Sequence, residues 1–520
     1  MANILSNPVT VALDATGSGT RYDVGPGQTL THPNQVPWSG LVAGDVVNIH
    51  YDATEYVAKF AIHGRGTALN HIIINGVTDA SGNRPRINGQ GATTPATTQG
   101  GANPVYPTPA VAGTEAVGVV TIRRGPNDIA GYLAGYITLQ NLDIYGADQG
   151  NTFTQLNGGT GTYGFSASIY GRAAEQVLVQ NCLLHNSTMG VFTMVNGPGL
   201  YPSDVQCYDW TFRGCRIYEW GTVGSDTVHG FYIQGVRFIT EYCFLGQGKV
   251  GAGGSSVKSR VGLGEIIRYN WIVAHARALD LVEMEEQMQN ETTPWTDSIL
   301  YGQDQWIDRV YGNVIINDEQ SPRGLSWRPI HYGADNLGEQ NGPGAAVPSQ
   351  MAHRKRLLFW NNTLVSRSNG AGASQMVFHL SLQSTVCDAW NNTFHFEGNI
   401  PLNWLFYAGT LNLSGNNVVY RTGGTLSSAM LDATAGQFAV NQLGTALSGN
   451  PLLTSLVPAT RDMTPLVGSS AIDAGGAAPA GVPTDTDTVF PIQYSPASRL
   501  NGAVGRAGTT TLGAFEFGEN

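Results

Sequence analysis

The 520-residue sequence predicts an all-β fold, a single right-handed parallel β-helix with an N-terminal cap and a C-terminal tail. Three observations predict it. A short strand–turn–strand unit recurs along the chain, no stretch keeps a helical periodicity, and the composition combines 67 glycines with only 12% charged residues. Low charge with abundant glycine is typical of all-β proteins that work outside the cytosol. The hydrophobic fraction of 42% is large enough for an extended core, so disorder is not predicted.

The recurring unit consists of two apolar runs joined by one turn residue, as in YITLQNLDIYG at 136–146 and LLFWNNTLVS at 357–366. The aligned turn residues are Asn141, Asn181, Gly214, Tyr242, Asn270, Gly312, Asn361, Asn391 and Asn416. Short strands that repeat with variable insertions indicate coils that stack through parallel ladders about 4.8 Å apart. Asparagine suits these turns because it tolerates left-handed backbone geometry and can hydrogen-bond from coil to coil. A propeller or sandwich would need antiparallel hairpins, whose two-residue turn signals are scarce here.

The cysteines support this register. The chain has five, with no CxxC pair, and an odd count argues against a disulfide framework. Cys182, Cys215 and Cys243 each follow an aligned turn residue by one position. They are therefore predicted to stack as small apolar side chains in one interior column, in preference to a metal or redox site.

Charge and hydropathy exclude several classes of partner. The net charge of −11 argues against general binding to nucleic acid or to an anionic membrane surface. No apolar run is long enough to span a bilayer, and no heptad segment predicts a trimer, so a monomer without membrane insertion is expected. The N-terminus lacks the basic and apolar regions of a secretory signal. We expect a secreted protein in a mature form or exported by another route, with a phage particle as the alternative.

Three segments are predicted along the chain. Residues 1–115 form the cap and first coils, 116–425 form the central β-helix that carries a groove, and 426–520 form the last coils and a tail. The segments VPWSGLVAGDVVNIH, GRGT and INGVTDASGNRPRINGQGA near the start, and SGNPLLTSLVPATRDMTPLVGSSAIDAGG near the end, resemble secreted bacterial β-helix proteins of the pectate-lyase-like superfamily. The resemblance implies a β-helix that acts on polysaccharides outside the cell. Such scaffolds carry lyases, hydrolases, epimerases and pure binders, so the activity must be argued from a site.

A candidate site centres on Lys258 and Arg260, which alternate with Ser259 on a predicted strand and therefore share one face. Counting from the turn residues predicts which side chains join them on neighbouring coils. These are His229 and Tyr232 on the coil before, Asp280, Glu283 and Glu285 on the coil after, then Trp327, Arg328 and His331, and finally His379. On the N-terminal side the same face is predicted to meet Ser166, Ser168, Thr193 and Asn196.

This column has the groups that β-elimination on a uronate requires. A cation must neutralise the carboxylate, a base must remove the neighbouring proton, and an acid must protonate the leaving oxygen. Lys258 is the candidate base because Arg260 crowds it, while Arg260, His229 and Tyr232 are candidates for the acid. Arg328, His331, His379 and Trp327 are predicted to bind an acidic polysaccharide. Asp280, Glu283 and Glu285 are predicted to hold Ca²⁺ that bridges to the substrate acid, with no organic cofactor.

The run SSVKSRVGLGEIIRYNWI also resembles the lysine-bearing segment of β-helix lyases of the chondroitinase-B and alginate-lyase type. That resemblance implies that Lys258 is the base. In those lyases the arginine acid lies on the next coil in an Arg-His context. Here that coil reads ARALDLVEMEE, in which Arg277 is displaced and no histidine follows it.

Three alternatives remain open from the residues. A glycoside hydrolase would use a carboxylate pair from Asp280, Glu283 and Glu285. A non-catalytic phage or surface protein would use the groove only to hold glycan. Lys258 and Arg260 would then serve as structural ion-pair partners of the neighbouring carboxylates. Trp404 and Tyr407 are candidates for stacking on sugars, although aromatic side chains more often belong to a core.

Overall fold

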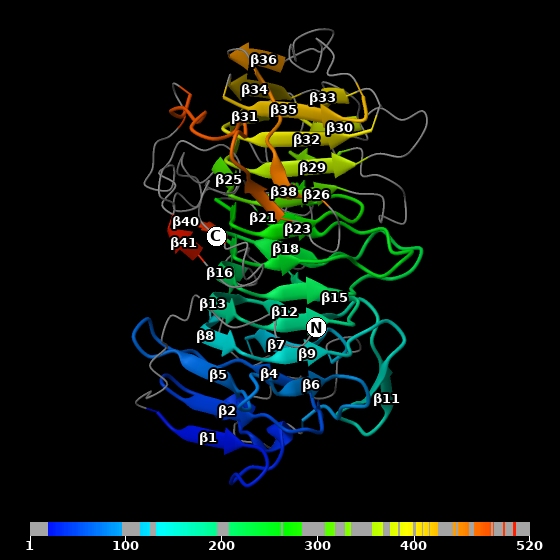
Figure 1. The fold of residues 1–520 in the computed structure, drawn as a ribbon. Coiled ribbons are helices and arrows are strands. Elements are labelled where there is room, and N and C mark those ends of the chain that lie inside the picture. Colours follow the sequence, from blue (N-terminus) through cyan, green and yellow to red (C-terminus); the bar gives the residue numbers. More distant parts are fainter. Residues whose placement is uncertain are drawn as a thin grey trace.

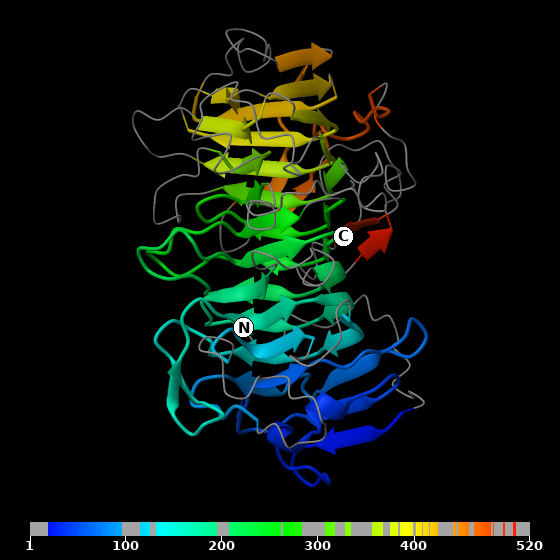
Figure 2. The same ribbon diagram turned by 180° about the vertical axis from the view of Figure 1, so that it is seen from behind.

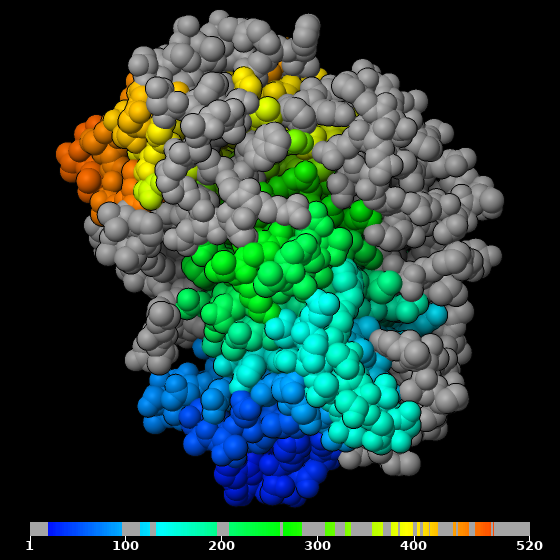
Figure 3. All heavy atoms as spheres, turned by 90° about the vertical axis from the view of Figure 1, so that its right-hand side faces the viewer, coloured from blue at the N-terminus to red at the C-terminus, as the bar shows by residue number. Residues whose placement is uncertain are grey.

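The structure is a computed structural model. It describes residues 19–95, 115–124, 132–194, 207–261, 264–282, 307–317, 328–333, 356–367, 375–382, 385–398, 402–407, 409–414, 416–424, 440–443, 446–456, 462–479, 482, 492–494 and 503–505. Short strands stack along one axis in the order of the sequence, from the blue coils at one end to the orange coils at the other (Figures 1 and 2). The space-filling view in Figure 3 shows the same progression on one face of the molecule.

Three long parallel sheets, here called sheets A, B and C, build the stack, and the chain visits them in turn. Sheet A contains β1 (Arg21–Val24), β2 (Val46–His50), β5 (Ile72–Val77), β8 (Ala134–Gln140), β13 (Ala174–Gln180), β16 (Cys207–Arg213), β19 (Ile239–Glu241), β22 (Ile266–Arg268), β25 (Ile307–Tyr311), β28 (Arg356–Trp360), β31 (Val386–Trp390), β34 (Thr410–Ser414) and β36 (Val440–Leu443). Sheet B contains β3 (Tyr56–Val57), β6 (Arg86–Asn88), β9 (Asp143–Tyr145), β14 (Leu183–His185), β17 (Arg216–Tyr218), β20 (Phe244–Leu245), β23 (Trp271–Val273), β26 (Val314–Asn317), β29 (Thr363–Arg367), β32 (Thr393–Glu397), β35 (Val418–Thr422) and β37 (Leu447–Ser448).

The candidate site lies on sheet C. It contains β4 (Phe60–Ile62), β7 (Gly118–Arg123), β12 (Ala167–Arg172), β15 (Met189–Thr193), β18 (Phe231–Gly235), β21 (Val257–Val261), β24 (Leu279–Leu281), β27 (Ile330–Tyr332), β30 (Gln375–Leu380) and β33 (Leu402–Tyr407). Each strand pairs with a strand one coil before and one coil after it, with parallel register throughout the three sheets. The predicted right-handed parallel β-helix is therefore confirmed.

Among the described strands, antiparallel pairing is confined to three short pairs outside the three long sheets. These pairs are β10 (Thr152–Thr154) with β11 (Thr160–Thr162), β38 (Leu453–Ser455) with β39 (Asp462–Pro465), and β40 (Ile492–Tyr494) with β41 (Ala503–Gly505). Within the described residues, helical structure is limited to two 3₁₀ turns, η1 (Pro33–Gln35) and η2 (Trp38–Gly40). None of the described helices is long and apolar enough to cross a membrane. The predicted boundaries at residues 115 and 425 stay predictions.

The turn between sheets A and B repeats one backbone conformation. Asn141, Asn181, Tyr242 and Asn361 have φ values of 59°, 53°, 55° and 50°, in the left-handed region that asparagine and glycine tolerate best. One predicted alignment was wrong by a residue. The left-handed residue on its coil is Tyr269, with φ 56°, and not Asn270. Asn270 lies one position beyond the turn because its side chain is directed into the interior, where it bonds to Asn313.

Asn270 and Asn313 belong to an asparagine ladder that runs through five coils. Its members each follow a turn residue by one position and are buried: Asn270, Asn313, Asn362, Asn392 and Asn417. Each side-chain oxygen accepts from the backbone amide of the coil before, as in Asn313 N to Asn362 Oδ1 at 3.0 Å and Asn362 N to Asn392 Oδ1 at 2.9 Å. The side-chain nitrogens donate along the same ladder, at 3.0 Å from Asn313 Nδ2 to Asn362 Oδ1. The ladder therefore fixes the register of successive coils.

The cysteine column continues this ladder toward the N-terminus, as predicted. Cys182, Cys215 and Cys243 are buried in the core, and the backbone amide of Cys243 donates to Asn270 Oδ1 at 2.9 Å. The Cys243 thiol donates to the Glu241 carbonyl at 3.3 Å. Burial raises the pKa of the Cys182 and Cys215 thiols well above the usual range, so they stay protonated and unreactive.

Replacing Asn362 with alanine should destabilise the stack by about 2–4 kcal/mol, because the buried backbone amide of Asn313 loses its acceptor and the carbonyl oxygen of Val310 loses a donor. The midpoint of urea unfolding measures the effect. Asn441→Ala removes an exposed asparagine of sheet A and serves as the matched control, with a shift below about 0.5 kcal/mol. Equal midpoints for the two variants would contradict a stabilising ladder.

Candidate functional site

One outward-facing column of sheet C collects the predicted charged residues. Strand pairing sets Tyr232 of β18 opposite Lys258 of β21, and Lys258 opposite Asp280 of β24. Asp280 lies opposite His331 of β27, which lies opposite His379 of β30. The residues on either side of each, such as Val257 and Ser259, point into the coil because side chains alternate along a strand. The stack thus brings five polar side chains from positions 232 to 379 into one row across about 20 Å.

Asp280 is the centre of this row. Its Oδ2 atom lies 3.0 Å from Lys258 Nζ, while its Oδ1 atom lies 2.8 Å from Arg277 Nη1 and 2.6 Å from His331 Nδ1. Ser255 adds a weaker hydroxyl contact to Oδ2 at 3.3 Å. The ion pair between Lys258 and Asp280, which the sequence allowed as a structural alternative, is therefore formed.

The cationic neighbours keep Asp280 ionised. Burial alone favours the neutral carboxyl, but the charges of Lys258 and Arg277 and the hydrogen bond from His331 outweigh it. Together they hold the pKa of Asp280 well below its usual range. Lys258 and Asp280 are 5% and 3% exposed, whereas the side chain of Arg277 is 23% exposed. Solvent and ligands therefore meet this cluster first at the Arg277 guanidinium.

His331 and His379 extend the row toward the C-terminal coils. Their rings stack with centroids 4.1 Å apart, and Arg328 Nη1 lies 3.4 Å from His379 Nδ1. His331 Nε2 lies 3.3 Å from the Ser381 hydroxyl. Burial, followed by the charges of His331 and Arg277, lowers the pKa of His379, so this ring is neutral at pH 7.

His229 and Tyr232 form the other end of the charged row. The Ser255 amide donates to His229 Nδ1 at 2.9 Å, which places the proton of the neutral ring on Nε2. The His229 and Tyr232 rings meet edge to face with centroids 5.0 Å apart. Arg260 lies two residues beyond Lys258 on β21, in register with Gln234 of β18, and is buried.

Four predicted residues lie outside the described part of the chain: Asn196, Glu283, Glu285 and Trp327. The predicted calcium site accordingly stays a prediction. Among the described residues no cluster of three or more His, Cys, Asp or Glu is arranged to hold a metal ion. The oxygens of Asp280, the one predicted calcium ligand that the structure describes, contact Lys258, Arg277 and His331.

Arg277 is the residue that the sequence argument left aside. It precedes β24 in the loop, and its guanidinium reaches His331 Nδ1 at 2.5 Å as well as Asp280. The arginine–histidine contact absent from the linear sequence is thus made across a coil 54 residues away. The only signal for it was the position of Arg277 on the coil after Lys258.

The N-terminal end of the column differs from the prediction. Tyr170 of β12 pairs with Phe192 of β15, and Phe192 pairs with Tyr232, so aromatic rings continue the row. Thr193, which was predicted for this face, has the opposite orientation because it alternates with Phe192. Its hydroxyl donates to the Gln234 carbonyl at 2.8 Å. Trp404, a predicted sugar-stacking candidate, is wrong for that role because it is 1% exposed within the core.

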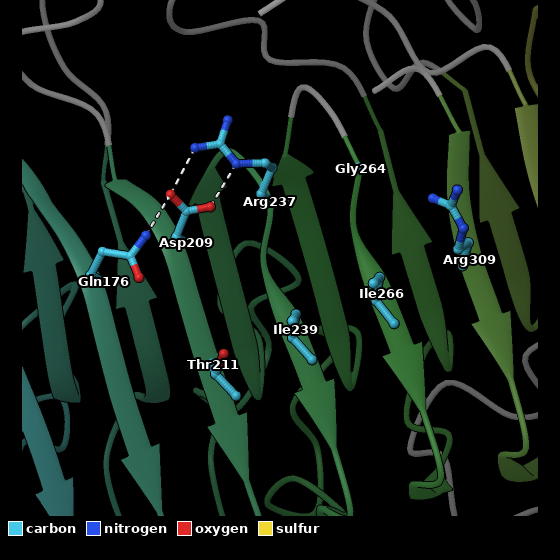
Figure 4. Close-up of a pocket in the computed structure, with 8 residues that line it drawn as sticks. All are labelled: Gln176, Asp209, Thr211, Arg237, Ile239, Gly264, Ile266 and Arg309. Carbon is cyan, nitrogen blue, oxygen red and sulfur yellow. Dashed lines mark hydrogen bonds and ion pairs between the residues drawn. The ribbon is translucent and has the colours of Figure 1, made fainter. Parts of the chain in front are cut away.

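A separate depression of about 490 Å³ lies on the outer face of sheet A (Figure 4). Its floor includes Thr211, Ile239 and Ile266, and Arg309 lies at one end. At the other end Asp209 accepts from Arg237 at 2.6 Å and 2.7 Å, and from Gln176 at 3.0 Å. The residues that line this depression include no histidine or lysine, unlike the row on sheet C.

Comparisons with known proteins concern the fold. No family model matches the chain, and no curated protein matches it. Among solved structures it is similar to the pectate lyase Pel9A at 11% identity and a TM-score of 0.45, over 97% of this chain and 98% of that one. It is also similar to an alginate lyase from Paenibacillus sp. str. FPU-7, at 12% identity and a TM-score of 0.33, over 77% and 93%. A rhamnogalacturonan lyase matches at 11% identity and a TM-score of 0.34, over 72% and 87%. None superposes closely enough to transfer a residue's role.

Asp280→Asn should destabilise the protein by about 3–5 kcal/mol at pH 7, because the buried Lys258 ammonium would lose its carboxylate and Arg277 would lose an ion pair. The pKa of Asp280 is lowered by folding, so its stabilisation is present above the unfolded pKa of about 4 and is lost as the pH falls through the folded value. Urea unfolding at pH 7 and at about pH 3 measures this. The difference in the free energy of unfolding between wild type and variant should be smaller at the lower pH. Asp226→Asn, at an exposed carboxylate, is the control. A gap independent of pH would contradict this account.

Proposed function

We propose that this protein is a polysaccharide lyase that cleaves a uronate-containing glycan outside the cell by β-elimination at the Lys258 column. One observation carries the proposal: Tyr232, Lys258, Asp280, His331 and His379 share one outward row, and Arg277 and Arg328 flank it. Cationic and neutral donors outnumber the single carboxylate in this row. Such a row suits an anionic substrate and offers groups for two proton transfers.

The arginines would bind the substrate carboxylate. Arg277, at the solvent-exposed edge of the cluster, and Arg328, beside His379, are flanking guanidinium groups. Neutralising a uronate carboxylate acidifies the hydrogen on the adjacent carbon, because the charge that develops there is delocalised into the carboxyl group. A planar guanidinium suits this role because it donates two parallel hydrogen bonds to a carboxylate.

Lys258 would transfer the first proton. Lys258 first releases to solvent the proton that it carries in its ion pair with Asp280, and the neutral amine then takes the hydrogen from the carbon next to the carboxyl group. The electron pair left behind forms a carbon–carbon double bond, and the bond from the neighbouring carbon to the glycosidic oxygen breaks. Asp280, 3.0 Å from Nζ, stabilises the ammonium that Lys258 becomes. The released oxygen takes its proton from Tyr232 or His229, the two donors at the adjacent end of the row.

The hydrolase alternative has less support. It needs two carboxyl groups, of which the acid must hold its proton near neutral pH. Asp280 has the opposite property, since its neighbours hold its pKa well below the usual range. The described part of the column offers no second carboxylate beside it.

Lys258→Ala should reduce kcat/KM on the responsive glycan by about 10²- to 10⁴-fold, with Asp280 still paired to Arg277 and His331. The assay follows the ultraviolet absorbance of the unsaturated product over a panel of polyuronates. Lys258→Arg should not restore activity, because a guanidinium remains protonated. Lys249→Ala, which removes a lysine paired with Asp148, is the matched control.

New reducing ends that form without the ultraviolet absorbance would show that the protein is a hydrolase and not a lyase. Binding without any product would leave a glycan-binding protein. Turnover by Lys258→Ala at the wild-type rate would show that Lys258 is not the base.

Chelation provides a separate test, because the reaction is proposed to run on protein groups. Dialysis against EDTA should leave kcat/KM unchanged within about twofold. Loss of activity that added Ca²⁺ restores would contradict this and support the predicted calcium site at Asp280, Glu283 and Glu285.

A further inference from the structure

An aromatic cluster adjoins the charged row on its N-terminal side. The Phe192 and Tyr232 rings stack at 5.2 Å with an angle of 25° between their planes, and Tyr170 meets Phe192 edge to face at 5.6 Å. All three rings are buried, at 2% to 8% exposure, in a small apolar cluster outside the main core. Tyr232 is also the strand partner of Lys258. The row therefore changes from charged to aromatic within one coil, about 4.8 Å from Lys258.

Phe165 covers this cluster and remains exposed. It precedes β12, and its ring lies perpendicular to Phe192 and Tyr232, with centroid distances of 5.1 Å and 6.0 Å. These contacts hold its orientation, yet 46% of the residue is exposed. Among the large hydrophobic residues that the described part of the chain exposes, Phe165 is the one aromatic. An aromatic ring that is held on two sides and exposed on the rest is arranged to contact a ligand.

The chemistry of this surface matches the face of a sugar ring. A pyranose presents axial C–H bonds on its face, and the electron-rich face of an aromatic ring attracts such polarised hydrogens. Lys258 lies two coils from Phe192 on the same face of sheet C, and Arg277 follows on the next coil, so both cations are available for carboxylates. A uronate polymer needs both kinds of contact, because each of its rings has an apolar face and an anionic edge.

We infer that Phe165, supported by Phe192 and Tyr232, is a stacking subsite for a sugar ring of an acidic glycan, on the N-terminal side of Lys258. The inference rests on the proposed function, because it describes how the same face of sheet C holds its substrate. It also gives the chain a direction. The bound glycan runs across the coils of sheet C, from the Phe165 ring past Lys258 toward His331 and His379.

Phe165→Ala should raise KM on the responsive polymer by about 3- to 10-fold while kcat stays within about twofold, because stacking holds the substrate without entering the bond-breaking step. Phe165→Tyr and Phe165→Trp should restore KM. Phe165→Leu, which keeps the apolar character and loses the planar ring, should not. Leu69→Ala removes a side chain that is 93% exposed outside this cluster and is the matched control. Equal thermal midpoints for the variants and wild type show that folding is unchanged.

Binding of the same glycans by calorimetry separates this inference from the proposed function. If wild type binds a glycan without cleaving it and Phe165→Ala weakens that binding, the stacking subsite is supported and the proposed lyase activity is contradicted. If wild type cleaves and Phe165→Ala leaves KM and binding unchanged, the subsite is wrong and the lyase stands. A Phe165→Ala variant that changes only the oligomeric state, with glycan binding intact, also overturns the subsite in favour of a protein interface.

Discussion

The in-register stacking of parallel coils is the constraint on which the rest of this structure depends. A parallel ladder sets each residue opposite one residue of the next coil, so a slip of one position would turn every outward side chain inward. The asparagine ladder of Asn270, Asn313, Asn362, Asn392 and Asn417 prevents such a slip, because each amide side chain bonds both backbone and side chain of its neighbour. The same coils place Lys258, Asp280 and His331 in one row. Interior register and exterior site are therefore one property of the stack.

The site concentrates charge in a protein that has little of it. Lys258, Arg277 and His331 converge on Asp280, and all but Arg277 are nearly excluded from solvent. In such surroundings electrostatic interactions are stronger than at a surface, and losing one partner leaves the others unsatisfied. The arrangement is a structural ion-pair cluster, and in the proposed function its members also transfer protons. The two descriptions are compatible, since proton-transfer groups must be held rigidly before a substrate arrives.

The inner and outer faces of the coils could not be predicted from the sequence equally well. The interior followed from the sequence in part, because the cysteine column and the left-handed turns are local patterns that packing reinforces. The asparagine ladder was missed and Asn270 was misplaced, because two adjacent positions both suit asparagine: the turn outside and the ladder inside. The exterior row was also predicted in part, since Lys258, Asp280, His331 and His379 were counted from the turns. Phe192 was missed in favour of Thr193, because a count uncertain by one residue reverses the face of a strand.

The sequence by itself determined the β-helix, its interior cysteine column and the strands that share the Lys258 face, because these depend on repeats and on side-chain alternation. Only the tertiary structure decided which groups touch. Arg277 meets His331 across 54 residues, and Phe165 lies over rings from two other coils. Such contacts depend on loop conformations and side-chain directions that no repeat encodes. The physical reason is that strand register is set by ladders common to all coils, whereas each loop has its own length and path.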